Sequence, residues 1–426
     1  MTVTDISVEM LTIGQRARSA ARVLVSLSTE VKNQALENIA DALGAHRDTV
    51  LAANELDYRA AQESGLSEAL LGRLALTSDS IEAMASDVRN VALLPDPIGE
   101  QFDVSTLPNG LVLGRRRVPL GVIGAIYESR PNITVDIASL CLKAGNAVVL
   151  RGGREALHSN SALAALVRQA VALAGVPEDA VQFVESTDRA LVGQMLKMHE
   201  YIDLMIPRGG ADLVRRVAEE AAMPAVTGGI GVCHTYVDGQ ADLDMAVDIA
   251  FNAKVQHPTV CNALDTLLVH SKAAPEYLPR IARAWLDAGV TIHADGRAMS
   301  ILGPIEDIRI VPAEEGDWGR EFLSLDAAVK VVDSLDEALE HIEQYGSGHS
   351  EAIVTEDDST ATRFLDMVDA AVVLVNTSTR FVDGGQFGLG AEVAISTSKM
   401  HARGPMGLRE ITSYKWTVLG SGQVRS

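Results

Sequence analysis

The chain has 426 residues, of which 47% are hydrophobic, 22% charged and 4% aromatic, and its formal net charge is -21. A length of this order predicts two or three globular units, each with its own core. The acidic balance argues against a nucleic-acid partner, because a polyanion is bound by clustered Lys and Arg that release counterions. No apolar run approaches the roughly 20 residues that cross a bilayer, and the first residues lack a secretory pattern. We expect a cytoplasmic protein with no membrane partner.

Three cysteines, Cys141, Cys233 and Cys261, are odd in number and widely spaced. They build neither a disulfide framework nor a CxxC metal site, so we expect no metal and a reducing compartment. At least one thiol is then a candidate for reactivity.

The region from Thr12 to Ala92 has helical periodicity. Ser28 is placed to cap a helix whose apolar face is formed by Val31, Ala35, Leu36, Ile39 and Leu43. Two β-prone runs, 102–107 and 111–113, then flank Pro108-Asn109-Gly110. Asn-Gly between such runs predicts a hairpin, since both turn residues tolerate a positive φ. We expect this hairpin to protrude and to pair with another subunit.

Strands and helices alternate after the hairpin. Strands are expected at 118–127, 147–150, 181–184 and 204–206, each followed by a helix, at 133–144, 159–174, 188–198 and 211–221. A second series has strands at 262–270, 328–332 and 372–376 and helices at 279–288 and 336–344. Segments 383–390 and 404–407 read as glycine-rich loop, and 414–419 reads as a strand. This alternation predicts open parallel sheets with ligands at the carboxyl ends of the strands.

Cys261 is the leading candidate for chemistry. It lies between an expected helix and a strand, and loops between rigid elements often present reactive groups. Lys254 and His257 are near enough in sequence to lower a thiol pKa. The alternative for any cysteine is a small buried residue with no chemical role. We accept that interpretation for Cys141, which lies in an apolar helix. Cys233 fits both the reactive and the buried interpretation.

Two glycine pairs are candidate phosphate contacts. Gly209-Gly210 lies between a strand and a helix amino terminus, where backbone N–H groups and the helix dipole favour an anion; a simple tight turn is the alternative. Arg151-Gly152-Gly153 follows a buried strand, and Arg151 is either a solvated charge or a partner for a nucleotide phosphate. Gly229-Ile230-Gly231 is no complete GxGxxG, so the ordinary dinucleotide fingerprint is absent.

Several of these motifs stand in the order that is typical of the aldehyde dehydrogenase superfamily, which the chain resembles. They are 119–124 followed by Asn132, 143–151 with Arg151 where lysine is usual, Gly209-Gly210, Thr227-Gly228-Gly229, Cys261, Glu321-Phe322 and Asn376. Over nearly its whole length the chain further resembles the glutamate-5-semialdehyde dehydrogenase family, at segments 127–132, 150–153, 376–381, 404–408 and 414–416.

The resemblance implies a fold, a reaction and partners. It implies an α/β aldehyde dehydrogenase-like fold with two open α/β domains, one for the cofactor and one catalytic, and an oligomerisation hairpin. The reaction implied is NADPH-dependent reduction of γ-glutamyl phosphate to glutamate 5-semialdehyde and phosphate, the second step of proline biosynthesis. The partners implied are further copies of the chain, as a dimer or tetramer, and functional coupling to glutamate kinase.

The resemblance also implies residue roles. Cys261 is the implied nucleophile and Asn132 the donor to the oxyanion. The implied cofactor-binding residues are Arg151, Gly152, Gly153, Gly209, Gly210, Thr227, Gly228, Glu321 and Phe322. The candidate substrate-binding residues are Arg130, His257, Asn376, Arg380, Lys399 and His401, with Lys254 and Arg403 as further cations.

One departure from the wider superfamily bears on the reaction. Segment 226–229 carries no carboxylate that activates water against a thioester, so inorganic phosphate is the expected acyl acceptor. Three alternatives stay open: a CoA-acylating aldehyde dehydrogenase, a cysteine acyltransferase or hydrolase without nicotinamide, and a non-catalytic paralogue.

The expected domains follow the motifs. Residues 1–98 and 119–255 form the cofactor-binding domain and 256–380 the catalytic domain. Residues 99–118 with 411–426 form the oligomerisation hairpin and its tail strand, and 381–410 a glycine-rich return segment.

Overall fold

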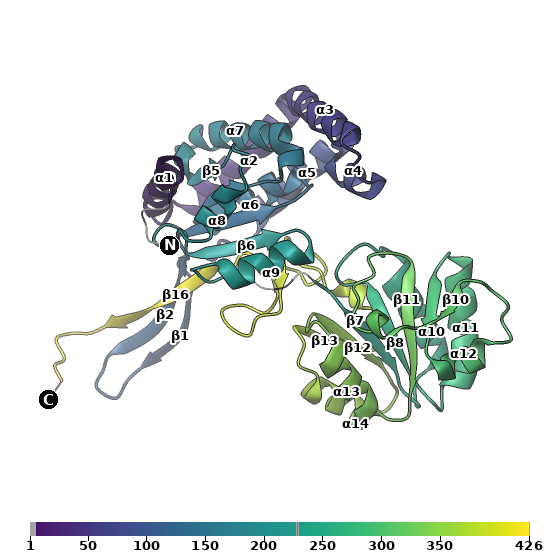
Figure 1. The fold of residues 1–426 in the computed structure, drawn as a ribbon. Coiled ribbons are helices and arrows are strands. Elements are labelled where there is room, and N and C mark those ends of the chain that lie inside the picture. The colour runs from purple at the N-terminus through teal and green to yellow at the C-terminus, as the bar shows by residue number, and fades with distance from the viewer. Residues whose placement is uncertain (1–5, 227, 229, 426) are drawn as a thin grey trace. The chain divides into compact units, whose positions relative to one another are not determined.

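The computed structural model describes residues 6–226, 228 and 230–425 (Figure 1). The chain divides into two compact units, which we call unit 1 and unit 2. Unit 1 comprises Met1–Thr227, Gly388–Ala394 and Met406–Ser426, and unit 2 comprises Gly228–Phe387 and Ile395–Pro405. Each unit contains an open parallel sheet with helices, so the expected α/β class is confirmed. Among the described residues, no helix combines the length and the apolar character needed to span a membrane.

Unit 1 begins with a helical region, as expected. Its helices are α1 (Val8–Leu24), α2 (Thr29–Ala45), α3 (Arg47–Glu63), α4 (Glu68–Leu74) and α5 (Ser78–Leu93). The predicted cap is confirmed, because the Ser28 side chain accepts a hydrogen bond from the Val31 N–H. The apolar face that follows is buried at Ala35, Leu36, Ile39 and Leu43.

The parallel sheet of unit 1 has the strand order β5-β4-β3-β6. Its strands are β3 (Val122–Tyr127), β4 (Ala147–Arg151), β5 (Val181–Phe183) and β6 (Leu204–Arg208). Its helices are α6 (Asn132–Lys143), α7 (Leu157–Ala172), α8 (Ala190–Met195) and α9 (Ala211–Glu220). Strand β3 pairs with β4 on one side and with β6 on the other, so the strand order reverses between β3 and β6. That reversal is where open α/β sheets leave a crevice for ligands.

A separate antiparallel sheet of unit 1 has the order β1-β2-β16. Its strands are β1 (Gln101–Thr106), β2 (Val112–Pro119) and β16 (Thr412–Leu419), and β16 pairs with β2 along its whole length. The hairpin is present, but only Gly110 of its turn has a positive φ, 83°. The turn closes through the Gly110 N–H, which donates to the Leu107 carbonyl at 2.8 Å.

Unit 2 is built on a seven-stranded parallel sheet with the order β10-β9-β11-β8-β7-β12-β13. Its strands are β7 (Cys233–Val237), β8 (Leu264–His270), β9 (Thr291–Ala294), β10 (Ile310–Pro312), β11 (Asp326–Val332), β12 (Ser350–Val354) and β13 (Val372–Val375). Its helices are α10 (Leu243–Val255), α11 (Ala274–Asp287), α12 (Gly296–Leu302), α13 (Leu335–Tyr345) and α14 (Asp358–Met367). Short 3-10 turns in the two units are η2 (Arg154–Ala156), η3 (Glu178–Ala180), η4 (Glu315–Asp317) and η5 (Thr379–Phe381).

Two expectations need correction. The single strand expected at 118–127 is two strands in two sheets, because Gly121, with a φ of 130°, turns the chain between β2 and β3. The segment expected as loop at 404–407 contains β15 (Gly404–Met406), which pairs with β14 (Ala394–Ser396). The boundary between the two compact units lies near residue 227, because β7 pairs with β8 and β12 and therefore belongs to unit 2; the expected domain roles stay a prediction.

Helix α14 offers a test of where the core of unit 2 lies. Phe364 is fully buried against Ile342, Ile353 and Val368, whereas its neighbour Leu365 is 47% exposed. Phe364→Ala should lower the free energy of unfolding of unit 2 by about 3–5 kcal/mol. Leu365→Ala, the matched control, should cost less than about 1 kcal/mol. Urea unfolding measures both, and equal losses would show that α14 is not packed as described.

Candidate functional site

The crevice between β3 and β6 brings an acid and a helix amino terminus together. Glu128 follows β3, and Gly209 and Gly210 follow β6 and precede α9. The Gly210 N–H donates a hydrogen bond to Glu128 Oε2 at 3.0 Å. The carboxylate also lies against Gly209, where an added Cβ would come within 2.4 Å of Glu128 Oε2. The glycine pair predicted to bind phosphate thus already holds an anionic group of the protein.

Arg151 is the last residue of β4, and it is only 9% exposed. Its Nη1 donates to the Gly152 carbonyl at 2.9 Å, while its buried Nε has no hydrogen-bond partner among the described residues. Burial lowers the pKa of this guanidinium, and Glu155 raises it. Sequence reasoning left open whether Arg151 is a solvated charge, and its burial excludes that reading.

The glycines that follow Arg151 are held by neighbouring side chains. Gly152 is buried beside the Asn160 amide, and Gly153 is buried beside the Glu155 carboxylate. Glu155 Oε1 accepts hydrogen bonds from the backbone N–H and the hydroxyl of Ser129, at 2.7 and 2.9 Å. Ser129 has a φ of 45°, so Glu155 stabilises the left-handed turn that follows Glu128.

Asn132, the proposed oxyanion donor, is the first residue of α6. Its Nδ2 donates to Asp136 Oδ2, one helical turn later, at 2.8 Å. Burial raises the pKa of Asp136 to about 7, while the hydrogen bond from Asn132 lowers it. The bond fixes the orientation of the Asn132 amide and uses one of its two N–H donors. Sequence reasoning missed Asp136, although its spacing of four residues from Asn132 is the signal that was available.

Cys261 lies in the turn between α10 and β8, and it is neither fully exposed nor buried. Cys141 and Cys233 are buried, and burial raises the pKa of both thiols. The Cys233 thiol donates to the carbonyl oxygen of Cys261 at 3.2 Å. A Cβ added at Gly231 would lie 1.5 Å from the same oxygen, so only glycine permits this approach. Cys261 is therefore the accessible thiol of the three, on a turn that is held from its backbone.

Glu321 and Phe322 lie on the same side of unit 2 as the Cys261 turn. Glu321 Oε1 accepts a hydrogen bond from the Gly231 N–H at 2.9 Å, and Gly231 packs on Cys261. The Phe322 N–H donates to Asp265 Oδ1 at 3.0 Å, and the ring is buried, 5.2 Å from that of His293. Glu321 therefore contacts the turn that carries Cys261, whereas the Phe322 ring is packed inside unit 2.

Lys254 does not act as a free cation beside the thiol. Its ammonium is completely buried, donates to the Leu264 carbonyl at 2.8 Å and lies 3.8 Å from Asp265 Oδ1. Burial raises the pKa of Asp265 to about 7, and Lys254 lowers it. The Lys254–Asp265 pair therefore anchors Phe322 to the start of β8.

Arg380 is hydrogen-bonded to the residue that follows Cys261. It lies in η5, where its Nε donates to Gln256 Oε1 at 3.0 Å and its Nη1 donates to Asn262 Oδ1. Burial lowers the pKa of Arg380, while Asp383 and Cys261 raise it. Because Asn262 directly follows Cys261, its hydrogen bond with Arg380 holds the guanidinium at the turn that carries the cysteine. Asn262, the residue after the cysteine, was not anticipated as the group that holds this arginine.

The other candidates for substrate binding are more dispersed. The side chain of Asn376 is engaged at Thr355, whose N–H it accepts and to whose carbonyl it donates, both at 2.9 Å. The Lys399 ammonium pairs with Asp369, as does Arg403 at 2.7 Å. His401 and His257 are exposed, and Arg130 is half-buried.

Gly228 packs against the backbone of Ile395, and Thr227 lies outside the described residues.

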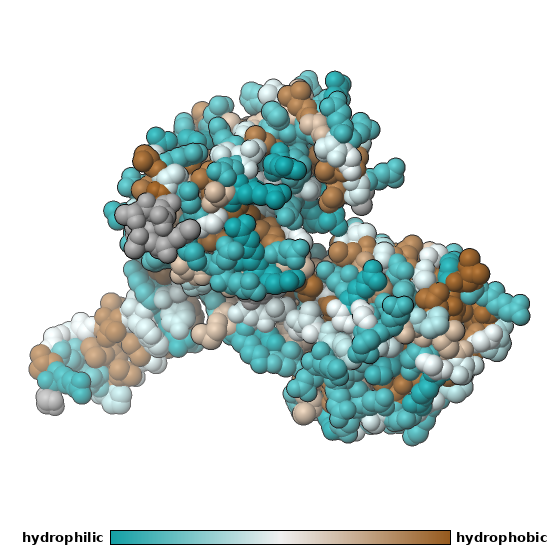
Figure 2. Space-filling model, in the orientation of Figure 1, coloured by the Kyte–Doolittle hydropathy of each residue, from teal (hydrophilic) through white to brown (hydrophobic). Residues whose placement is uncertain are grey.

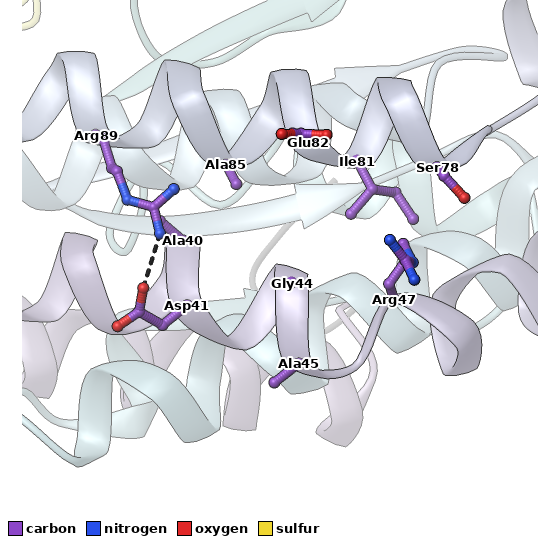
Figure 3. Close-up of a pocket in the computed structure, with 10 residues that line it drawn as sticks. All are labelled: Ala40, Asp41, Gly44, Ala45, Arg47, Ser78, Ile81, Glu82, Ala85 and Arg89. Carbon is purple, nitrogen blue, oxygen red and sulfur yellow. Dashed lines mark hydrogen bonds and ion pairs between the residues drawn. The ribbon is translucent and has the colours of Figure 1, made fainter.

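A shallow surface pocket of about 550 Å³ lies between α2 and α5 (Figure 3). Two of its charged residues, Arg89 and Asp41, pair with each other at 2.7 Å, and none of the predicted site residues lines it. We assign this pocket no role in the chemistry.

Comparison with known proteins agrees with this fold. The model of the aldehyde dehydrogenase family matches residues 7–307, and the chain therefore belongs to that family. A protein of Dehalococcoides mccartyi (strain CBDB1) named γ-glutamyl phosphate reductase is 59% identical over 96% of each chain. One of the same name from Roseiflexus castenholzii is 56% identical over 97% of this chain and 99% of its own. These relatives place the chain among the γ-glutamyl phosphate reductases, an alternative name for the glutamate-5-semialdehyde dehydrogenases.

A solved structure has the same architecture. The crystal structure of γ-glutamyl phosphate reductase from Thermotoga maritima superposes with a TM-score of 0.95 at 47% identity, covering 98% of this chain and 100% of that one. The expected family and fold are confirmed.

Asp136 provides a test that depends on pH. Its folded-state pKa, about 7, exceeds the ordinary value of 3.8, so the folded protein binds the proton more tightly than the unfolded chain. Between these values, rising pH should therefore lower the stability of unit 1, by at most about 1.4 kcal/mol per pH unit. Asp136→Asn removes that loss. In urea unfolding at pH 5, 6 and 7, the free energy of unfolding of the variant should rise relative to that of the wild type as the pH rises. A difference that stays constant with pH would contradict the assignment.

Proposed function

We propose that this chain reduces L-γ-glutamyl phosphate to L-glutamate 5-semialdehyde, with release of phosphate, by NADPH-dependent covalent catalysis on Cys261, in the cytoplasm. The observation that carries the proposal is the partly exposed Cys261, on a turn whose next residue, Asn262, binds the Arg380 guanidinium. The names and close similarity of the relatives support the substrate. The reaction is the second step of proline biosynthesis.

The residues of the β3–β6 crevice fit a dinucleotide. The Gly210 N–H already binds an anionic carboxylate, and a pyrophosphate oxygen offers the same kind of acceptor. The unsatisfied Nε of Arg151 fits a further phosphate oxygen. We propose that Arg151, Gly152, Gly153, Gly209 and Gly210 hold the phosphates of NADP, with Thr227 and Gly228 beside them. We also propose that Glu321 and the Phe322 backbone hold the nicotinamide ribose.

Cys261 opens the reaction by attacking the acyl carbon of γ-glutamyl phosphate. Phosphate is the leaving group, so the step needs no strong general acid, and a thioester forms on Cys261. The backbone N–H of Cys261 and the second N–H of Asn132 are the proposed donors to the developing oxyanion, each worth about 3 kcal/mol. When bound, NADPH supplies the hydride that reduces the acyl group. The Cys261 thiolate then leaves as the aldehyde forms.

The anionic substrate needs cations to orient it. Arg380 is our first choice, because it is hydrogen-bonded to the residue that follows the proposed nucleophile. Arg130, His257 and His401 are proposed as further contacts. Lys399 would have to exchange its partner Asp369 for a substrate oxygen, and Asn376 would have to release Thr355.

Cys261→Ser tests the nucleophile. A serine hydroxyl is far less nucleophilic than a thiolate, so the rate should fall at least about 1000-fold. The assay is reduction of NADP at 340 nm with pyrroline-5-carboxylate, the cyclised form of the semialdehyde, and inorganic phosphate. Cys141→Ala, a buried thiol in α6, is the control and should keep most of the rate. A serine variant that also keeps it would remove Cys261 from the mechanism.

The same assay separates the rival functions. A requirement for CoA in place of phosphate would indicate a CoA-acylating aldehyde dehydrogenase. No change in absorbance with any aldehyde would favour a cysteine acyltransferase or a non-catalytic paralogue.

We further propose that the chain assembles as a homo-oligomer through the β1-β2-β16 sheet. Large apolar side chains are exposed on its strands, and Figure 2 shows hydrophobic surface there. They are Val104, Tyr414, Trp416, Val418 and Leu419. An exposed sheet with an apolar face and free edges is a usual site of pairing between subunits. Functional coupling to glutamate kinase remains part of the proposal.

Deleting Val104 to Leu113 should dissociate the oligomer, because it removes the turn of the β1–β2 hairpin and the strand residues next to it. Light scattering coupled to size exclusion measures the mass, which should fall to that of one chain, 45.3 kDa for the full sequence. Trp416→Glu is a milder companion variant and should weaken assembly in the same direction. An unchanged mass in both would exclude this sheet as the interface.

A further inference from the structure

The crevice between β3 and β6 contains an acid that the reaction does not use. Glu128 is exposed, and its carboxylate accepts the hydrogen bond of the Gly210 N–H, the residue that caps α9. This N–H lies at the amino terminus of a helix of ten residues, where the helix dipole favours an anion. The carboxylate thus occupies the backbone donor that a cofactor phosphate needs.

Two acids lie near Arg151, and they differ in burial and in hydrogen bonding. Burial lowers the pKa of Arg151; Glu155 and Glu128 raise it, and Arg189 and Arg216 lower it further. Glu155 is half-buried and bound twice by Ser129, so it belongs to the framework. Glu128 is exposed and is bound to the backbone of Gly210. Of these two acids, Glu128 is the one that can leave the crevice without breaking a buried network.

We propose that Glu128 is an internal competitor for the dinucleotide, occupying the Gly210 N–H in the free protein and giving way to the cofactor pyrophosphate. The inference rests on the proposed function of this crevice. Each molecule of cofactor must displace the carboxylate to bind, and the carboxylate rebinds the N–H when the cofactor leaves. Glu128 therefore lowers the affinity for the dinucleotide and favours its release after turnover.

Glu128→Gln tests the proposal, because it keeps the size of the side chain and removes the charge. The dissociation constant for NADPH, measured by titration of nicotinamide fluorescence, should fall on the order of two- to fivefold. The matched control is Glu219→Gln, which removes the same charge from an exposed residue near the other end of α9. That variant should bind NADPH as the wild type does.

Inorganic pyrophosphate provides a second probe. It should compete with NADPH in the wild type and compete better in Glu128→Gln. Equal or weaker binding of NADPH by Glu128→Gln would overturn the proposal. Tighter binding supports it, because a general loosening of unit 1 would weaken the binding of NADPH. A wild-type protein with no saturable binding of NADPH would instead contradict the proposed cofactor, so the two failures are distinguishable.

Discussion

The close approach of Gly231 to the carbonyl oxygen of Cys261 is the constraint on which the proposed catalytic centre depends. Two further groups hold the same turn. The Cys233 thiol donates a hydrogen bond to that oxygen, and Glu321 accepts a hydrogen bond from the Gly231 N–H. The cysteine is therefore positioned through its backbone, which leaves its side chain partly accessible. Glu321, proposed to hold the cofactor ribose, is hydrogen-bonded to Gly231, which packs on the turn of Cys261. A substitution at Gly231 should therefore disturb both Cys261, the proposed nucleophile, and Glu321, the proposed ribose contact.

The two units present their residues at opposite ends of their strands. In unit 1, Glu128, Arg151 and Gly209 follow β3, β4 and β6, at the carboxyl ends where open α/β sheets bind ligands. In unit 2, Cys233 starts β7, and Cys261 and Phe322 precede β8 and β11. Since these strands are parallel, their amino ends share one edge of the sheet. The residues proposed to bind the cofactor in unit 1 thus lie at carboxyl ends of strands, whereas the proposed nucleophile of unit 2 lies at the amino ends.

The sequence predicts the parts of this molecule that depend on local physical chemistry. Ser28 caps its helix as expected, because capping needs only a hydroxyl and the next turn. The burial of Lys254 beside Asp265 was not predictable, because it depends on the pairing of β8 with its neighbours. The same holds for Arg380, whose partner Asn262 is distant in sequence. Asn-Gly in the hairpin predicted the turn correctly but not its conformation, since only Gly110 has a positive φ.

A net charge of -21 is compatible with the anion sites proposed for this chain. At physiological ionic strength charges are screened over about 8 Å, so a phosphate responds mainly to its near neighbours. Near the crevice of unit 1 those neighbours include Arg151, only 9% exposed, and near Cys261 they include Arg380. A partly buried guanidinium is screened less than a surface lysine, and one well-placed cation therefore outweighs many distant carboxylates. If the proposed competition holds, the nearest acid, Glu128, limits anion binding in unit 1 more than the overall acidity of the chain does.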